Sequence, residues 1–243
     1  SGMAGNFPHI LGVDAAGEVA KVGDGVRQWK KGDRVAPHFI LSCGVCQNCI
    51  SGKENICLSF GILGATQWGT YAEYVKVGAH HLVAIPDKLD YDQAVSAYVP
   101  FATAWEALIE VGKLQAGENV LINAASSGVG SAGIQIAKLA GARVLTTSSS
   151  AQKLTRAKKL GADVGINYRT QKIGAQARKM TGGLGVDIAL EMVGGETLKQ
   201  TIDVLAPGGR IVTVGAHGGE QVDFDMIEFF RKHISMHGCG RST

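Results

Sequence analysis

The chain lacks the features that mark membrane, secreted and nucleic-acid-binding proteins. No apolar run approaches the ~18 residues that span a bilayer, and no basic-then-apolar leader pattern marks a secretory signal. No five like charges follow one another and the net charge is only +3, so no nucleic-acid partner is expected. Internal repeats and low-complexity segments are also missing. We therefore expect a cytoplasmic globular protein with a small-molecule substrate and neither membrane nor nucleic-acid partners.

Glycine, in contrast, is abundant. The 34 glycines among 243 residues are about twice the usual share of ~7%. They follow no fixed period, which excludes a collagen-like chain. Scattered glycines indicate tight turns and close backbone approaches, as in α/β nucleotide-binding proteins.

The sequence pattern changes near residue 98. Before it, short apolar runs broken by Gly, Pro and Asp predict an all-β, barrel-like domain. After it, apolar strands alternate with helix-period stretches, which indicates a parallel sheet covered by helices on both faces. Six such strands match a doubly wound sheet. The strands are predicted at 119–123, 143–147, 163–167, 186–192, 210–215 and 234–238, and the helices at 130–141, 151–161, 173–182 and 195–209.

Four of the five cysteines lie within fifteen residues. The set Cys43, Cys46, Cys49 and Cys57 has the spacing C-x2-C-x2-C-x7-C. Four thiolates on one loop can surround a tetrahedral zinc ion and leave no position open for a substrate, so the predicted zinc is structural. The alternatives are two disulfides, which an intracellular setting disfavours, or free thiols.

A glycine-bearing turn joins the first strand of the second half to its helix. Gly128, Gly130 and Gly133 have the G-x-G-x-x-G spacing directly after the strand that ends at Asn123. In a dinucleotide-binding turn the first glycine permits the tight bend, the second admits the pyrophosphate and the third lets the helix pack closely on the strand. The helix N-terminus then offers free N–H groups to the phosphates. The alternative is a glycine-rich connection in an unrelated α/β domain.

The end of the next strand indicates which dinucleotide binds. NAD-binding domains carry an acidic residue there for the ribose hydroxyls, but this chain reads "VLTTSSSAQK". Ser148, Ser149 and Ser150 offer hydrogen-bond donors, and Lys153 adds a positive charge that suits a 2′-phosphate. Arg156 is a weaker candidate of the same kind, and both basic residues could simply be solvated.

The motifs "GDRV", "GTYAEY", "FATAWEAL", "AASSGVG", "KLGADVGINY" and "GGRIVTVG" follow one another in the chain. Together with the four-cysteine segment, they resemble the medium-chain dehydrogenase/reductase superfamily, particularly its quinone-oxidoreductase-like and zinc-type alcohol-dehydrogenase-like members. The resemblance implies an α/β protein with a GroES-like β-barrel domain over residues 1–97 and an NADP-binding, six-stranded Rossmann domain over 98–243. It also implies that the chain is truncated at both ends, and that the last strand pairs across a homodimer.

The motif and the resemblance together predict a cofactor site. In related NADPH-dependent quinone reductases, a lysine and the tyrosine of "INY" bind the 2′-phosphate, and the matching residues here are Lys153 and Tyr168. The resemblance places four further residues near the nicotinamide. The complete predicted set is Thr103, Ser127, Gly128, Val129, Gly130, Ser148, Ser149, Lys153, Tyr168, Val193, Gly215 and His217.

The chain departs from the zinc alcohol dehydrogenases at their catalytic metal. Val13 stands where those enzymes have a histidine ligand, and Val99 stands where they have a cysteine. Because valine offers no lone pair, a catalytic zinc is not expected. Asp14 matches the acidic residue of the same motif and is expected to hydrogen-bond to its neighbours instead.

No catalytic acid is identifiable from the sequence. His9, His38, His80 and His81 are the histidines considered as ligands or acids. His38 follows a strand that could face the cleft and is kept as a candidate, whereas the adjacent His80 and His81 are expected at the surface. Cys239 is expected to be a buried thiol.

The sequence thus predicts an NADP(H)-dependent oxidoreductase with one structural zinc. It would transfer a hydride to a quinone, an enone or an activated carbonyl, since conjugated acceptors need no Lewis-acid metal. One alternative is a zinc-dependent alcohol dehydrogenase with ligands outside this chain. The other is a non-catalytic nucleotide-binding protein.

Overall fold

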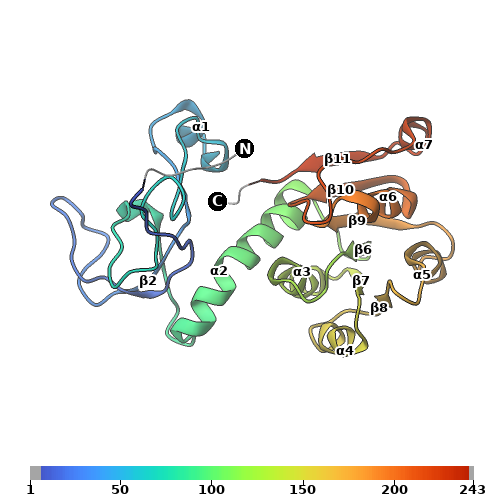
Figure 1. Ribbon diagram of the computed structural model, residues 1–243, viewed down its shortest axis with the longest axis horizontal. Helices are drawn as coiled ribbons and strands as arrows, with labels where there is room; N and C mark the ends of the chain where they lie inside the picture. Colours follow the sequence, from blue (N-terminus) through green and yellow to red (C-terminus); the bar gives the residue numbers. More distant parts are fainter. Residues whose placement is uncertain (1–6, 241–243) are drawn as a thin grey trace. The chain divides into compact units, whose positions relative to one another are not determined.

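A computed structural model describes residues 7–240, which form two compact units (Figure 1). The first unit ends at Val99 and the second comprises Pro100–Gly240. None of the described helices is long and apolar enough to cross a membrane.

The first unit consists of short strands joined by long loops. Its three-stranded antiparallel sheet has the order β1-β2-β5, and β3 and β4 form a second, two-stranded sheet. Buried Ala36, Ile85 and Ala94 form its apolar core. The elements are β1 (Gly17–Glu18), β2 (Arg34–Pro37), β3 (Ile40–Leu41), α1 (Gln47–Ile50), η1 (Glu54–Ile56), β4 (Gly61–Ile62), η2 (Ala79–His81) and β5 (Leu82–Ala84).

A long helix, α2 (Tyr91–Trp105), which was not predicted from the sequence, begins before the change of pattern near residue 98. Asp90 explains its start, because its Oδ1 accepts a hydrogen bond from the Gln93 amide at 2.7 Å while Gln93 Oε1 accepts one from the Asp90 amide at 3.2 Å. This reciprocal capping box satisfies two amides at the helix start. A π-helical segment, η3 (Glu106–Val111), follows α2.

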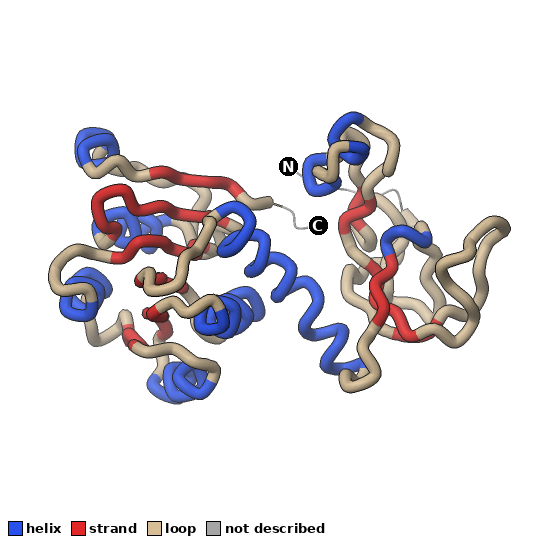
Figure 2. The backbone as a smooth tube through the Cα atoms, turned by 180° about the vertical axis from the view of Figure 1, so that it is seen from behind, coloured by secondary structure: helices blue, strands red, loops and turns tan. Residues whose placement is uncertain are grey.

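The second unit is a doubly wound sheet of six parallel strands, in the order β11-β10-β9-β6-β7-β8. Figure 2 shows the strands of this unit in red, with helices in blue around them. Helices α3 and α4 cover one face and α5 and α6 the other (Figure 1). The predicted fold class is thereby confirmed. The elements are β6 (Asn119–Ile122), α3 (Gly128–Leu139), β7 (Arg143–Ser148), α4 (Ala151–Lys159), β8 (Val164–Asn167), α5 (Ile173–Met180), β9 (Val186–Glu191), α6 (Gly195–Asp203), β10 (Leu205–Thr213), α7 (Met226–Arg231) and β11 (Ser235–Gly238).

Two details differ from the sequence prediction. The helix predicted over 195–209 ends at Asp203, and β10 already begins at Leu205. Pro207 cannot continue a helix, and the pairing of β10 with β9 shifts its register before Arg210. The short helix α7 was not predicted, and Asp225 caps it by accepting two backbone hydrogen bonds.

β11 forms one edge of the sheet. No other strand of residues 7–240 pairs with its outer side. An exposed strand edge is a common site of pairing between chains, but the homodimer expected from the family resemblance stays a prediction.

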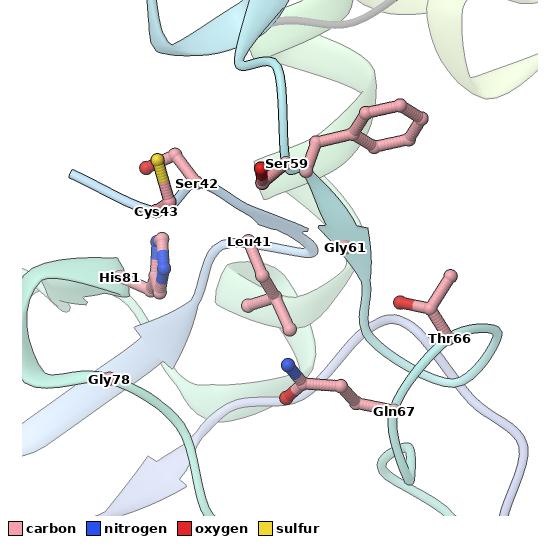
Figure 3. A pocket seen from close by; sticks show the side chains of 10 residues that line it. Leu41, Ser42, Cys43, Ser59, Gly61, Thr66, Gln67, Gly78 and His81 are labelled. Carbon is pink, nitrogen blue, oxygen red and sulfur yellow. The ribbon is translucent and has the colours of Figure 1, made fainter. Parts of the chain in front are cut away.

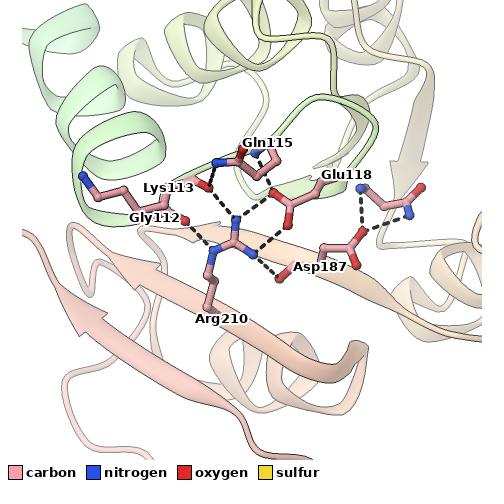
Figure 4. A network of polar contacts seen from close by, with 7 residues as sticks. Gly112, Lys113, Gln115, Glu118, Asp187 and Arg210 are labelled. Carbon is pink, nitrogen blue, oxygen red and sulfur yellow. Dashed lines mark hydrogen bonds and ion pairs between the residues drawn. The ribbon is translucent and has the colours of Figure 1, made fainter.

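Arg210 closes the end of the sheet at which β6 begins (Figure 4). Its guanidinium donates to both carboxylate oxygens of Glu118, at 2.9 and 2.7 Å, and to the carbonyl oxygens of Gly112, Lys113 and Asp187. Burial alone would raise the pKa of Glu118, but the hydrogen bonds from Arg210 and the Gln115 amide lower it overall. One side chain therefore joins η3, β6 and β9.

We expect Arg210→Ala to lower the free energy of unfolding by about 2 kcal/mol, because it leaves a mostly buried carboxylate and several carbonyls without their donor. Urea denaturation of the intact protein measures the loss. The matched control is Lys199→Ala, which removes an exposed 3.9 Å ion pair with Glu196 and should change stability by less than about 0.5 kcal/mol. Equal effects of the two substitutions would contradict this role for Arg210.

Candidate functional site

The turn between β6 and α3 presents a helix N-terminus with free amides. Ser127 caps the helix, and its Oγ accepts a hydrogen bond from the Gly130 amide at 2.9 Å. The Ser131 amide makes the first helical hydrogen bond, to the Ser127 carbonyl. The amides of Gly128 and Val129 precede that bond, so they are available to an anion together with the positive end of the helix dipole.

The glycines of this turn act differently from the sequence interpretation in one respect. The residue in the left-handed region is Ala124, with φ 56°; Gly128 does not adopt a positive φ. Gly128 instead lies against Pro100, since a Cβ there would come within 3.0 Å of Pro100 Cγ. A Cβ on Gly130 would overlap the carbonyl oxygen of Ala124, so this position admits no side chain.

Gly133 has the predicted role of bringing the helix close to the strands. Its Cβ position lies 2.8 Å from Leu190 Cδ2 and 3.5 Å from Ile122 Cδ1. A side chain would therefore push α3 away from β6 and β9. The N-terminus of α3 consequently stands directly at the carboxyl edge of the sheet.

Two of the residues predicted for the 2′-phosphate, Ser148 and Tyr168, lie side by side at the ends of neighbouring strands. Ser148 ends β7, and its carbonyl accepts a hydrogen bond from the Tyr168 amide at 3.1 Å. Tyr168 is 53% exposed, and Lys153 is exposed near the start of α4. Ser149 connects β7 to α4, and Arg156 lies one turn further along the helix. We call Ser148, Ser149, Lys153 and Tyr168 the basic rim.

The basic rim contains no carboxylate. Residues 148–162 include no Asp or Glu. Asp163 precedes β8, at the opposite end of that strand from Tyr168, where it accepts a hydrogen bond from the Val144 amide and pairs with Lys138 at 3.0 Å. An anion at the rim would therefore meet donors and positive charge without a nearby acidic group.

The predicted nicotinamide-side residues gather at the ends of β9 and β10. The Val193 carbonyl accepts a hydrogen bond from the Gly218 amide at 2.5 Å, and the His217 amide lies 3.5 Å from the Met192 carbonyl. The Cβ position of Gly215 lies 3.2 Å from the same Met192 oxygen. The remaining predicted residue, Thr103, lies on α2, three residues after the Pro100 that contacts Gly128.

Sequence reasoning missed a buried polar network beneath these turns, formed by Asn123, Thr147, Glu191 and Thr201. A signal was present, because three of these polar residues stand in or directly after apolar strands. The carboxyl ends of parallel strands meet at one edge of a sheet, where ligands bind in open α/β sheets.

The four predicted zinc ligands converge in the first unit. Their sulfur atoms all lie within 4.8 Å of one another, with pairs at 3.4 and 3.9 Å. Four Zn–S bonds of ~2.3 Å in a tetrahedron place the sulfurs ~3.8 Å apart, so the arrangement fits zinc. Backbone N–H groups of Cys43 and Ser59 point at the Cys57 sulfur, at 3.3 and 3.4 Å. Amides of Leu58 and Cys49 likewise lower the pKa of the Cys46 thiol to about 6.

We call residues 43–57, which contain the four cysteines, the cysteine lobe. A cavity of about 350 Å³ opens beside the cysteine lobe (Figure 3). Ser42, Cys43, Gln67 and His81 are among its lining residues. His81 is buried, contrary to the expected surface position, and its carbonyl accepts a hydrogen bond from the His38 amide at 2.6 Å. Burial, and then the neighbouring His80, lower its pKa to about 4. His81 is therefore neutral near pH 7 and a poor proton donor.

The other residues considered from the sequence, His9, His80, Asp14 and Cys239, contact neighbouring residues or are buried. His9 Nε2 lies 3.1 Å from the Gly64 carbonyl, and the ring of exposed His80 lies 3.9 Å from that of His81, centroid to centroid, at an interplanar angle of 46°. The Asp14 carbonyl accepts a hydrogen bond from the Thr70 hydroxyl at 2.7 Å, and burial raises the pKa of the Asp14 carboxyl. Cys239 is buried, as expected, and burial raises its pKa to about 11.

Comparison with known proteins agrees with this architecture. Residues 1–87 match the alcohol dehydrogenase GroES-like domain family, and residues 128–243 match the zinc-binding dehydrogenase family. Human quinone oxidoreductase is 32% identical over 89% of the chain and 58% of its own length. Sorbitol dehydrogenase of Bacillus subtilis is 32% identical over 99% of the chain and 69% of its own length.

A solved structure described as an NAD-dependent alcohol dehydrogenase superposes with a TM-score of 0.92 at 40% identity, and the match covers 96% of this chain and 68% of that one. The chain thus spans about three fifths to two thirds of the length of these relatives. From both family matches, these identities and the shared fold, we conclude that the chain belongs to the medium-chain dehydrogenase/reductase superfamily of oxidoreductases.

Proposed function

We propose that this protein binds NADP(H) and transfers a hydride to a quinone, an enone or an activated carbonyl without a catalytic zinc. The observation that carries the proposal is the basic rim beside the β6–α3 turn. The turn offers free amides to a diphosphate, and the rim offers Lys153, Tyr168 and two serines to a further anion. A 2′-phosphate distinguishes NADP(H) from NAD(H).

The first unit supports a reaction without a Lewis-acid metal. Val13 and Val99 present only hydrocarbon at the positions that would supply two of the metal ligands. When bound, NADPH supplies the hydride, and the protein contributes binding, orientation and exclusion of water. Quinones and enones accept a hydride readily because conjugation spreads the developing negative charge.

The cysteine lobe supports one structural zinc. All four sulfurs converge on one point, so a zinc ion there has no open coordination position. Such an ion stabilises the folded lobe and does not contact a substrate.

Lys153→Ala should weaken NADPH binding much more than NADH binding. Loss of a charge-assisted hydrogen bond costs about 1.5–3 kcal/mol, which corresponds to a roughly 10- to 150-fold rise in the Kd for NADPH. Isothermal titration of the intact protein with each nucleotide measures both constants. Lys159→Ala is the matched control, because it removes the same charge from the other end of α4. A similar loss for both nucleotides, or for both variants, would refute the 2′-phosphate assignment.

Metal analysis and turnover assays separate the remaining functions. We expect one zinc per chain in the intact protein, with NADPH oxidation by quinones or enones.

Cys57→Ser should remove that zinc and lower the melting temperature, since structural zinc contributes on the order of 10 kcal/mol of folding free energy. Two zinc ions per chain would favour a zinc-dependent alcohol dehydrogenase. One relative, sorbitol dehydrogenase of Bacillus subtilis, is named for the oxidation of an alcohol. Nucleotide binding with no turnover on any acceptor would favour a non-catalytic protein.

A further inference from the structure

The carboxyl edge of the six-stranded sheet contains a fully buried carboxylate that no step above uses. Glu191 ends β9 and is 0% exposed. Its polar neighbours Asn123, Thr147 and Thr201 are at most 2% exposed. A buried charge is costly unless hydrogen bonds compensate for it. The hydrogen bonds to the Glu191 carboxylate therefore indicate which parts of the chain it holds in place.

Every hydrogen-bond partner of the Glu191 carboxylate is a donor. Oε1 accepts from the backbone amides of Val193 and Gly194, at 2.5 and 2.8 Å. Oε2 accepts from Asn123 Nδ2 at 2.6 Å and from the Thr201 hydroxyl at 3.1 Å. Within residues 7–240 no ion pair involves this carboxylate. Three N–H groups therefore hold the carboxylate, and the fourth contact is the Thr201 hydroxyl, which also lies 2.8 Å from the Thr197 carbonyl.

The two backbone donors belong to the segment that joins β9 to α6. Gly194 has φ 73°, and a Cβ on it would overlap the carbonyl oxygen of Gly219. The Val193 carbonyl accepts from the Gly218 amide, and the Gly195 amide donates to Gly219. Glu191 therefore fixes the backbone of 193–195 against 216–219. We call these two segments the paired loops.

The other carboxylate oxygen, Oε2, is connected to the β6–α3 turn by a chain of hydrogen bonds. Asn123 donates to Glu191, and its Oδ1 accepts from the Thr147 hydroxyl at 3.0 Å. Thr147 Oγ1 in turn accepts from the amide of Ala124 at 3.3 Å. Ala124 is the left-handed residue whose carbonyl lies against Gly130. One chain of hydrogen bonds thus joins the paired loops to the turn that offers amides to the diphosphate.

We propose that Glu191 is a positioning residue that holds the paired loops in register with the β6–α3 turn, so that they present the nicotinamide to the substrate. This inference rests on the proposed function, because it presumes that a nicotinamide nucleotide lies along this edge. It assigns to Glu191 no contact with the nucleotide. The carboxylate acts through the backbone amides of Val193 and Gly194.

Glu191→Gln tests the proposal with little change in shape. A glutamine side chain offers one oxygen, so either the loop amides or Asn123 and Thr201 face an NH2 group instead of an acceptor. The amides of Val193 and Gly194 should then exchange with solvent at least tenfold faster in the nucleotide-free protein, as measured by NMR. The kcat for NADPH oxidation should fall roughly 10- to 100-fold through misplacement. The Kd for 2′,5′-ADP, which lacks the nicotinamide half, should stay within about twofold because Glu191 makes no hydrogen bond to a residue of the basic rim.

Thr201→Val is the matched control. It removes one donor to Oε2 from the same buried network but leaves the bonds from Val193 and Gly194 in place. It should lower the melting temperature, while kcat and exchange at the two loop amides stay near wild type. Equal losses of kcat in Glu191→Gln and Thr201→Val would show that Glu191 only stabilises the core, and would overturn the proposal.

Wild-type protein provides a test that does not depend on a variant folding. The amides of Val193 and Gly194 should be protected from exchange without nucleotide, and fast exchange there would overturn the positioning role. An unchanged kcat in a folded Glu191→Gln protein would do the same. Failure of the wild type to bind either 2′,5′-ADP or NADPH would instead refute the proposed function, with the loop amides still protected.

Discussion

The close contact between α3 and the sheet is the constraint on which the candidate site depends. Gly133 lets the helix approach Leu190 and Ile122, and Gly130 lets its first turn lie against the Ala124 carbonyl. A larger residue at either position would displace the helix. The free amides of Gly128 and Val129 lie at the carboxyl edge of the sheet because the turn directly follows β6, and the glycines keep this end of the helix close to the strands. The diphosphate site that we propose there thus depends on backbone packing.

The same edge combines two different environments. At the basic rim, the exposed side chains of Lys153 and Tyr168 offer a positive charge and a hydroxyl group to solvent. Beneath the paired loops, a buried carboxylate is satisfied by neutral donors alone. The first environment suits recognition of an anion, and the second suits rigid placement of a backbone. A parallel sheet brings both to one edge because all its strands end there.

Much of the second unit could be predicted from the sequence. The alternation of apolar strands with helical stretches marks all six strands, and Gly133 has the predicted packing role. Local capping was harder to identify, because the Asp90–Gln93 pair that starts α2 lies outside an apolar pattern. The left-handed φ of Ala124 could not be predicted, since alanine rarely adopts it and only the buried hydrogen bonds of the turn stabilise it.

The site was predictable where chemistry is local and was missed where it depends on long-range contacts. The four cysteines are close in sequence, so their spacing alone indicates a metal site. Glu191 and Asn123 are separated by 68 residues, and only the strand order brings them together. The most direct test of the account is a calorimetric titration of the intact protein with 2′,5′-ADP and with 5′-AMP. The account predicts that 2′,5′-ADP binds at least about tenfold more tightly, and equal affinities would contradict it.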